Sequence, residues 1–513
     1  MTQAEVMAIL ESGKSVLLTG AAGTGKTYVL NDFIKRARND GKSVAVTATT
    51  GLAATHLNGS TIHSWSGIGV DDELHHYFFE KLGKSRRDTI AKADILIIDE
   101  ISMLHDFRLD MVEEIARKVR EVDEPFGGLQ VVLSGDFFQL PPINRSDSRE
   151  GSFITSSKVW AADHFTVCYL LQQYRQADDD AYAEILNGIR AGFLSGRQLA
   201  ALQARTGSFS DPFAAKTKLL TTNADVEEIN LEHLYRLTGK THEFEMETSG
   251  SKRYVDQLKK SCLAPEVLKL KVGAHVMCIK NSPDKKYVNG SLGIVTDFDP
   301  TTGYPKVKLN TGREITLKPE AWELNDGDKR RAMLTQLPLR LAWAITVHKS
   351  QGMTLDGAQV DLRRAFVEGM GYVALSRVKS LKTLVLDGLN GMALRVSPLA
   401  KQIDTELRER SASAIATHAD VIKAWEKAEK KRKASPAPPA PIAKVSNWNE
   451  KVLKMREKYP NAYKSWPEAD DKILRQAYLA GKKVSTIAKT LGRHDGAIRA
   501  RLKNIFGENI TFK

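Results

Sequence analysis

Residues 16–27 constrain the fold of this chain more than any other segment. They read V-L-L-T-G-A-A-G-T-G-K-T, so a short apolar run leads into the pattern G-x-x-x-x-G-K-T. In such a P-loop, glycines let backbone N–H groups point at phosphate oxygens, and the next helix adds its positive N-terminal end. A lysine reaches the β- and γ-phosphates, and a threonine hydroxyl reaches Mg²⁺. The segment therefore predicts a strand, a nucleotide-binding turn and a helix; the alternative is a glycine-rich turn without a ligand. The residues expected to hold the nucleotide and its metal are Gly20, Gly23, Thr24, Gly25, Lys26 and Thr27.

Three further apolar runs, at residues 43–47, 95–100 and 129–133, have the pattern of parallel strands that are buried on both faces. The second run ends in Asp99, expected to hold Mg²⁺, and Glu100, expected to orient or deprotonate the attacking water. Gln139 follows the third run, where a neutral side chain can sense the γ-phosphate; the alternative is a turn stopped by Pro141 and Pro142. Residues 1–158 thus predict a doubly wound α/β domain with a small insertion at about 56–90.

The second half has strand-like runs but no second P-loop. Residues 159–238 and 336–410 predict another α/β domain, which offers Arg175, Gln351 and Arg377 to the nucleotide of the first. Guanidinium groups that reach a γ-phosphate across a cleft act as arginine fingers, and the alternative is surface ion pairs. Between these segments, residues 239–335 contain short alternating strands and turn signals, which predict a small inserted antiparallel barrel.

Three motifs carry a specific resemblance: I-I-D-E-I-S-M at 97–103, G-G-L-Q-V-V-L-S-G-D-F-F-Q-L-P-P at 127–142 and H-K-S-Q-G-M-T at 348–354. With these motifs in this order, the chain resembles the PIF (petite integration frequency) family of DNA helicases, a RecD-like branch of superfamily one. The resemblance extends from Gln3 to about Leu386, with Tyr174 where the family more often has phenylalanine. It implies two RecA-like α/β domains, ATP and Mg²⁺ as cofactors, and 5′-to-3′ movement on single-stranded DNA for replication, repair and recombination.

The resemblance also implies roles for single residues. Gln3 would contact adenine, and Gln139, Arg175, Gln351 and Arg377 would sense or stabilise the γ-phosphate. The residues expected along the DNA strand are Thr50, Gly51, His63, Asn289, His348 and Lys349. Two alternatives remain: a DNA-stimulated translocase or remodeller that does not separate strands, and an ATP-switched DNA-binding regulator without catalysis.

The charge of the chain is concentrated in its last fifth. The formal net charge is +13, and residues 411–513 hold 22 lysines and arginines against 10 aspartates and glutamates. Such a block is typical of attraction to nucleic acid. Residues 411–462 predict a basic linker, in which K-K-R-K at 430–433 is either solvated or a nuclear signal and the Pro/Ala run at 435–441 is extended.

Residues 463–513 predict three short helices that resemble a Myb-like helix-turn-helix. We expect Arg499 and Arg501 to meet DNA there, and the alternative is a protein-docking unit. The chain opens with T-x-x-E, which caps a helix, and has no apolar run of about 18 residues. Together with three scattered cysteines, this predicts a cytoplasmic protein, bacterial or phage-encoded, without a membrane partner. We expect an active monomer on single-stranded and forked DNA.

Overall fold

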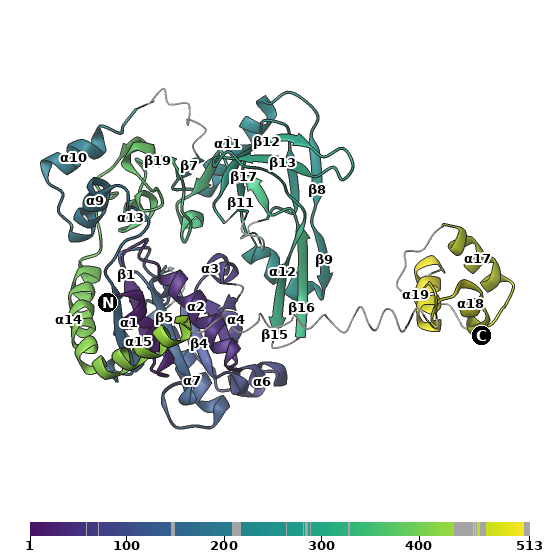
Figure 1. The fold of residues 1–513 in the computed structure, drawn as a ribbon, viewed down its shortest axis with the longest axis horizontal. Coiled ribbons are helices and arrows are strands. Elements are labelled where there is room, and N and C mark those ends of the chain that lie inside the picture. Colours follow the sequence, from purple (N-terminus) through teal and green to yellow (C-terminus); the bar gives the residue numbers. More distant parts are fainter. Residues whose placement is uncertain are drawn as a thin grey trace. The chain divides into compact units, whose positions relative to one another are not determined.

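The structure is a computed structural model whose chain forms two compact units, Met1–Glu426 and Lys427–Lys513 (Figure 1). It describes residues 1–57, 59–69, 71–144, 149–207, 217–262, 264–280, 282, 286–287, 289–326, 329–434, 455, 457, 459–461 and 468–506. Each unit is described below by itself. In the described residues, no helix combines the length and the apolar character that crossing a membrane requires.

A sheet of six parallel strands forms the first α/β domain. Its order is β3-β2-β4-β5-β1-β6, so the carboxyl ends of β4, β5 and β1 lie side by side. The apolar runs of the sequence form three strands whose residues are all buried, as expected of strands covered on both faces. The strands are β1 (Val16–Gly20), β2 (Val44–Ala48), β3 (Ser60–Thr61), β4 (Ile95–Asp99), β5 (Gln130–Gly135) and β6 (Thr166–Leu170).

Helices cover this sheet and begin where the sequence predicts. Helix α1 (Gln3–Glu11) is capped by Thr2, whose hydroxyl accepts from Glu5 N–H while the Glu5 carboxylate accepts from Thr2 N–H. Helix α2 (Lys26–Asn39) leaves the P-loop, and α7 (Asp106–Arg120) connects β4 to β5. The apolar side chains of α1, α2 and β1 share one buried core, which holds the P-loop on a rigid base.

A sheet of four parallel strands forms the second α/β domain, in the order β18-β7-β19-β20. Residues 371–375, one of the short apolar runs of the second half, form part of helix α13 and not a strand. A short, fully apolar run suits a buried helix as well as a strand, so periodicity does not separate the two. The elements are β7 (Thr217–Leu220), β18 (Ala344–Thr346), β19 (Ala358–Leu362), β20 (Leu384–Leu389), α9 (Asp180–Ala191), α10 (Gly196–Gln203), α11 (Asn223–Arg236) and α13 (Met370–Leu375).

The inserted region is antiparallel, as predicted. Five strands pair in the order β14-β13-β12-β11-β17, and a long hairpin of β15 and β16 pairs with β9. Arg331 on this hairpin donates to the Ser85 hydroxyl at 2.8 Å, so the insertion reaches the first domain. The strands are β9 (Glu247–Gly250), β11 (His275–Cys278), β12 (Leu292–Phe298), β13 (Pro305–Leu309), β14 (Glu314–Thr316), β15 (Glu320–Asp326), β16 (Lys329–Gln336) and β17 (Leu339–Leu341).

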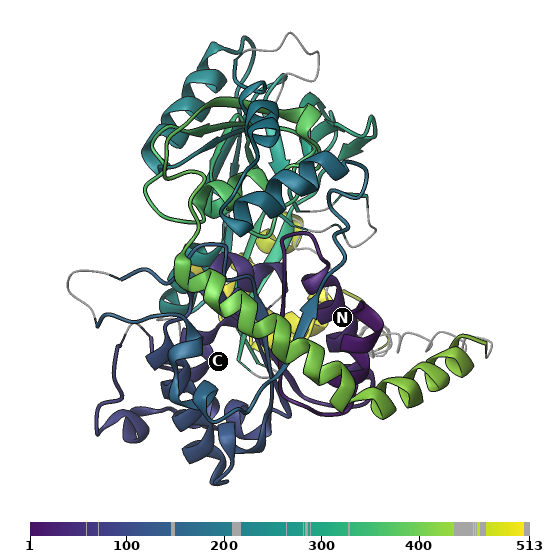
Figure 2. The same ribbon diagram turned by 90° about the vertical axis from the view of Figure 1, so that its left-hand side faces the viewer.

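Two expected boundaries differ in the structure. Strand β6 begins after the expected boundary at residue 158, yet it pairs with β1 in the first sheet. Residues 411–434, expected as linker, are helical in α14 (Pro398–Thr417) and α15 (Ala419–Ala434), which run in succession in Figure 2. The Ser411 hydroxyl accepts from Tyr169 N–H at 3.0 Å on the edge strand β6. Because a basic composition hid a few apolar positions such as Ile422, the sequence did not indicate this packing.

Within residues 468–506, the second unit forms three short helices, α17 (Glu468–Leu479), α18 (Val484–Leu491) and α19 (Asp495–Phe506). Leu474, Ile487, Leu491, Ile498 and Leu502 form its buried core. Gly492 ends α18 in the left-handed conformation (φ 60°), which glycine adopts without a steric penalty. Trp466, an aromatic residue just before the first of these helices in the sequence, lies outside the described residues.

Candidate nucleotide and DNA sites

The P-loop glycines are sterically required. Gly23 and Gly25 have φ of 85° and 87°, a region that favours glycine. A Cβ on Gly23 would lie 2.6 Å from the Arg175 Cβ, and one on Gly25 would lie 2.3 Å from the Gln3 amide nitrogen. Gln3 and Arg175, distant in sequence, therefore pack directly against the turn, and the Gln3 amide also donates to Thr24 O at 3.4 Å.

Lys26 is folded back over the loop. Its ammonium donates to Gly20 O at 2.8 Å and to Ala21 O at 3.1 Å. Desolvation lowers the pKa of Lys26, although the nearby carboxylates of Asp136 and Glu100 oppose this shift. Among the described residues Lys26 has no ion-pair partner, so its charge suits an incoming phosphate.

Two carboxylates face the loop from the end of β4. Asp99 is buried, and burial raises its pKa. Desolvation, followed by the charge of Asp99, raises the pKa of Glu100 to about 7. A divalent cation would relieve both effects, and carboxylate and hydroxyl oxygens are the ligands Mg²⁺ prefers. Asp99 and the Thr27 hydroxyl border the same cavity, so they fit this cation.

Arg175 follows β6 of the first sheet, Arg377 follows α13 of the second domain, and both border the cleft. Arg175 Nη1 donates to Ser376 O at 2.8 Å, and Arg377 donates through Nε to Val373 O at 2.9 Å. Desolvation and the charge of Arg377 lower the pKa of Arg175 to about 9, and desolvation lowers that of Arg377. Neither guanidinium has a carboxylate partner in the described part of the chain. Two adjacent, desolvated cations of this kind fit a polyphosphate.

One cavity of roughly 560 Å³ brings these groups together. Gln139 also borders it; its side chain is 6% exposed, and its amide oxygen has no partner among the described residues. A buried acceptor without a partner in this cavity can accept a hydrogen bond from the attacking water and so orient it. The expected residues that border the cavity are Gly23, Gly25, Lys26, Thr27, Asp99, Glu100, Gln139, Arg175 and Arg377.

A smaller cavity of roughly 180 Å³ contains part of the expected DNA set. Thr50, His348 and Lys349 border it, together with Glu100 and Gln351. Glu100 therefore faces both cavities. Gly51, also expected on DNA, begins helix α3 (Gly51–His56) directly after Thr50. Asn289, also expected on DNA, borders the nucleotide cavity and not this smaller one.

The ring of His63 is half-buried and contacts a side chain of the same domain. Arg108 donates to its ring nitrogen Nε2 at 3.1 Å and is itself paired with Asp72 at 2.6 Å. Desolvation and the charge of Arg108 lower the pKa of His63 to about 4, so the ring is neutral.

The basic residues of the last helix differ in role. Arg501 binds both Asp471 oxygens at 2.9 and 2.6 Å and so joins α19 to α17. The side chain of Arg499 is exposed. Of the two arginines expected on DNA, Arg501 is therefore committed to an internal ion pair and Arg499 lies on the surface.

A buried polar network behind the P-loop was missed in the sequence. Arg190 donates to the Asp136 carboxylate at 2.7 Å and to the Tyr372 hydroxyl at 3.1 Å. The Tyr372 hydroxyl donates to Asp136 at 3.2 Å and accepts from Ala22 N–H at 3.0 Å. Burial alone would raise the pKa of Asp136, but the charges of Arg190 and Lys26 lower it. Arg190 lies on an amphipathic helix, where an arginine usually indicates a solvated face, so sequence carried no signal for it.

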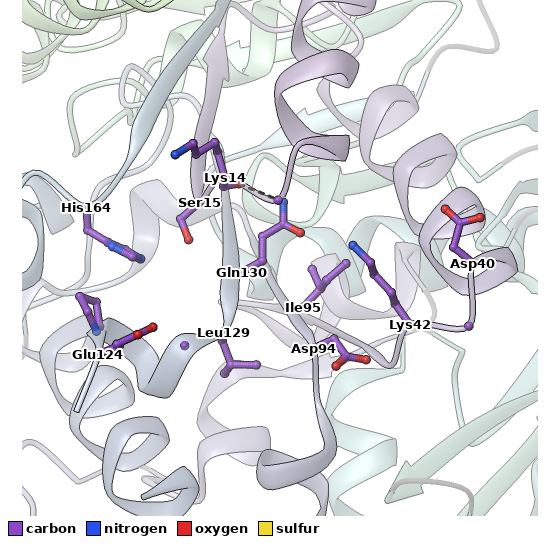
Figure 3. A pocket seen from close by; sticks show the side chains of 14 residues that line it. Lys14, Ser15, Asp40, Lys42, Asp94, Ile95, Glu124, Leu129, Gln130 and His164 are labelled. Atoms are coloured by element: carbon purple, nitrogen blue, oxygen red, sulfur yellow. Dashed lines mark hydrogen bonds between the residues drawn. The ribbon is translucent and has the colours of Figure 1, made fainter. Parts of the chain in front are cut away.

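A further polar hollow lies at the amino ends of the central strands, the edge opposite the P-loop (Figure 3). It measures roughly 630 Å³, and charges of both signs, including Lys14, Lys42 and Asp94, surround it. The Gln130 amide spans it, donating to Leu10 O at 2.8 Å and Lys14 O at 2.9 Å. Its polar groups thus connect α1 to the sheet.

A P-loop after β1, two carboxylates at the end of β4 in the same sheet, and Arg175 and Arg377 at the cleft toward a second parallel sheet define a P-loop nucleoside triphosphatase with paired RecA-like domains. Residues 2–195 match the family model of PIF1-like helicase, and residues 253–298 match that of the DNA helicase Pif1 2B domain. The chain belongs to the PIF1-like helicase family. The second match begins within helix α12 (Lys252–Ser261) and lies in the inserted antiparallel region.

Individual relatives agree with this assignment. ATP-dependent DNA helicase Pif1 of Psychrobacter sp. is 40% identical, over 82% of this chain and 73% of that protein. The crystal structure of Bacteroides sp Pif1 with ADP-AlF4 is 31% identical, with a TM-score of 0.69 over 79% of this chain and 96% of that one. The Bacteroides Pif1 helicase in complex with ADP-AlF3 and ssDNA is 32% identical, with a TM-score of 0.57 over 80% and 97%.

Proposed function

We propose that this protein is an ATP-dependent DNA helicase that moves 5′ to 3′ on single-stranded DNA and separates the duplex ahead of it. The observation that carries this proposal is the position of Glu100, which borders both the nucleotide cavity and the cavity of the expected DNA residues. A group of this kind links hydrolysis to the state of the strand. The names of the relatives, and the solved complex of one with ssDNA, support DNA as the partner.

The residues of the cleft divide the hydrolysis chemistry among them. The P-loop backbone and Lys26 bind the phosphates of ATP, and Gln3 packs at the base of the loop. Thr27 and Asp99 would hold Mg²⁺, which when bound neutralises phosphate charge. Glu100 takes the proton of the attacking water, and the free Gln139 amide oxygen accepts its second hydrogen. Arg175 and Arg377 stabilise the charge that develops on the γ-phosphate.

Movement follows from closing this cleft. Lys26 and Glu100 belong to the first domain, whereas Arg377 follows α13 of the second. ATP that binds both sides draws the domains together, and each domain grips the strand differently in the open and closed states. The β-strands of the inserted region would cover the single DNA strand and limit its movement in the reverse direction. We propose that a monomer does this on single-stranded and forked DNA.

Strand separation on forked duplexes tests the proposal. With ATP and Mg²⁺, a fork with a 5′ single-stranded tail should be unwound, and one with only a 3′ tail should not. Lys26→Ala should abolish hydrolysis and unwinding while DNA binding survives. If DNA stimulates hydrolysis but neither fork is unwound, the protein is a translocase or remodeller and not a helicase. If Lys26→Ala still hydrolyses ATP, the assignment of the nucleotide site is wrong.

A further inference from the structure

We infer that Gln351 is a DNA-responsive latch on Glu100. In the DNA-free protein its amide holds the Glu100 carboxylate toward the smaller cavity, and a DNA phosphate that enters this cavity moves Gln351 and releases the carboxylate toward the nucleotide. The inference rests on the proposed function, and it differs from the role of γ-phosphate sensor that the family resemblance implies for Gln351.

The latch is a single hydrogen bond between the two α/β domains. Gln351 Nε2 donates to Glu100 Oε2 at 3.0 Å, and the Gln351 side chain is 8% exposed. Glu100 directly follows β4 of the first sheet, whereas Gln351 directly follows the 3-10 turn η4 (His348–Ser350) of the second domain. In a desolvated site such a charge-assisted bond is strong, so it determines where the carboxylate points.

His348 and Lys349, which are expected along the DNA strand, lie in the turn that carries Gln351. Gln351 N–H donates to His348 O at 3.3 Å, and Lys349 N–H donates to the Thr346 hydroxyl at 3.2 Å. The turn is therefore compact, and a shift of Lys349 also shifts Gln351. Because Lys349 has no ion-pair partner among the described residues, its ammonium is available to a phosphate.

The backbone of Glu100 is held by contacts that are separate from the hydrogen bond of its carboxylate. Glu100 is left-handed (φ 54°), which is uncommon for a glutamate and persists only where its surroundings impose it. Thr49 imposes it here, since its hydroxyl donates to Glu100 O at 2.9 Å and its N–H donates to Asp99 O at 3.2 Å. Thr50, the next residue, borders the smaller cavity. A phosphate between Thr50 and Lys349 would therefore act on the latch and leave the main chain of Glu100 in place.

ATP hydrolysis by the full-length chain, with and without oligothymidylate, tests the latch. Gln351→Ala should raise the DNA-free rate at least threefold and lower the ratio of DNA-stimulated to DNA-free rate by a similar factor. Gln351→Glu, which cannot donate and repels Glu100, should act in the same direction. The matched control is Gln359→Ala, because the Gln359 amide donates to the Asp387 carboxylate at 2.5 Å within the second sheet, and it should leave the ratio unchanged.

The outcomes separate the latch from the proposed function. A DNA-free rate in Gln351→Ala at or below that of the unmodified protein overturns the latch, because a γ-phosphate sensor or a merely structural residue gives that result. If the unmodified protein shows no stimulation by DNA, the proposed function fails first. If it is stimulated, and Gln351→Ala keeps the same ratio, the proposed function stands and the latch alone is rejected.

Discussion

Arg190 donates to Asp136 at 2.7 Å, and both side chains are buried directly behind the P-loop. Arg190 belongs to α9, which packs on α13 of the second domain, and Asp136 follows β5 of the first. The Arg190 guanidinium also lies 4.1 Å from the centre of the Phe138 ring, a favourable cation–π distance. The ion pair thus fixes the region where the two domains join.

Removing one partner of this pair should be costly. Asp136→Asn should lower the free energy of unfolding by about 3–5 kcal/mol, because it leaves a buried guanidinium without its full countercharge. Urea unfolding followed by circular dichroism measures this. The control is Arg330→Ala, which breaks an exposed pair with Glu323 at 2.9 Å and should cost below about 1 kcal/mol. Equal losses in the two variants would contradict the special position of Asp136.

The pH dependence of hydrolysis should report Glu100. A base must be ionised, and the pKa of Glu100 is raised to about 7, so turnover should be low at pH 5.5 and rise through about pH 7. A higher Mg²⁺ concentration should shift this rise in turnover to lower pH, because a cation near Asp99 and Glu100 favours their ionised forms. Steady-state rates of ATP hydrolysis from pH 5.5 to 9 measure this rise. A hydrolysis rate that does not change with pH below pH 8 would exclude Glu100 as the base.

We propose that the C-terminal unit adds a second DNA contact. Deletion from residue 463 onward should weaken DNA binding most at low salt, because phosphate contacts release counterions. Fluorescence anisotropy at several salt concentrations measures both affinity and slope. Arg499→Ala should reproduce part of the loss, whereas Arg501→Ala should act first on the stability of the unit, since Arg501 binds Asp471. Unchanged affinity and slope after the deletion would favour the protein-docking alternative.

Much of this protein follows from local sequence. Residues 16–27 predicted the strand, the turn and the helix, because only glycines permit that backbone and only a lysine and a hydroxyl complete the phosphate site. The apolar runs also predicted β2, β4 and β5, and every residue of β4 and β5 is buried, as strands covered on both faces require. The ordered motifs added the family, which the relatives confirmed.

Other features depend on contacts between distant residues. The Arg190–Asp136 pair joins positions 54 residues apart, and the Gln351–Glu100 bond joins positions 251 apart. Nothing in the local pattern distinguishes Arg190 from a surface arginine, or indicates that Arg108 contacts His63. Likewise, Ala414 of α14 and Ile422 of α15 lie in the core of the first domain, which a basic composition does not reveal.

By itself, then, the sequence determined the chemistry of the nucleotide site, because backbone freedom, charge and hydroxyl groups act within a few residues of one another. Only the tertiary structure decided that Glu100 lies between the nucleotide and the expected DNA residues, and that Gln351 holds it there. The physical reason is that a hydrogen bond in a desolvated cleft depends on how two separately folded sheets face each other, and no local preference of either segment encodes that geometry.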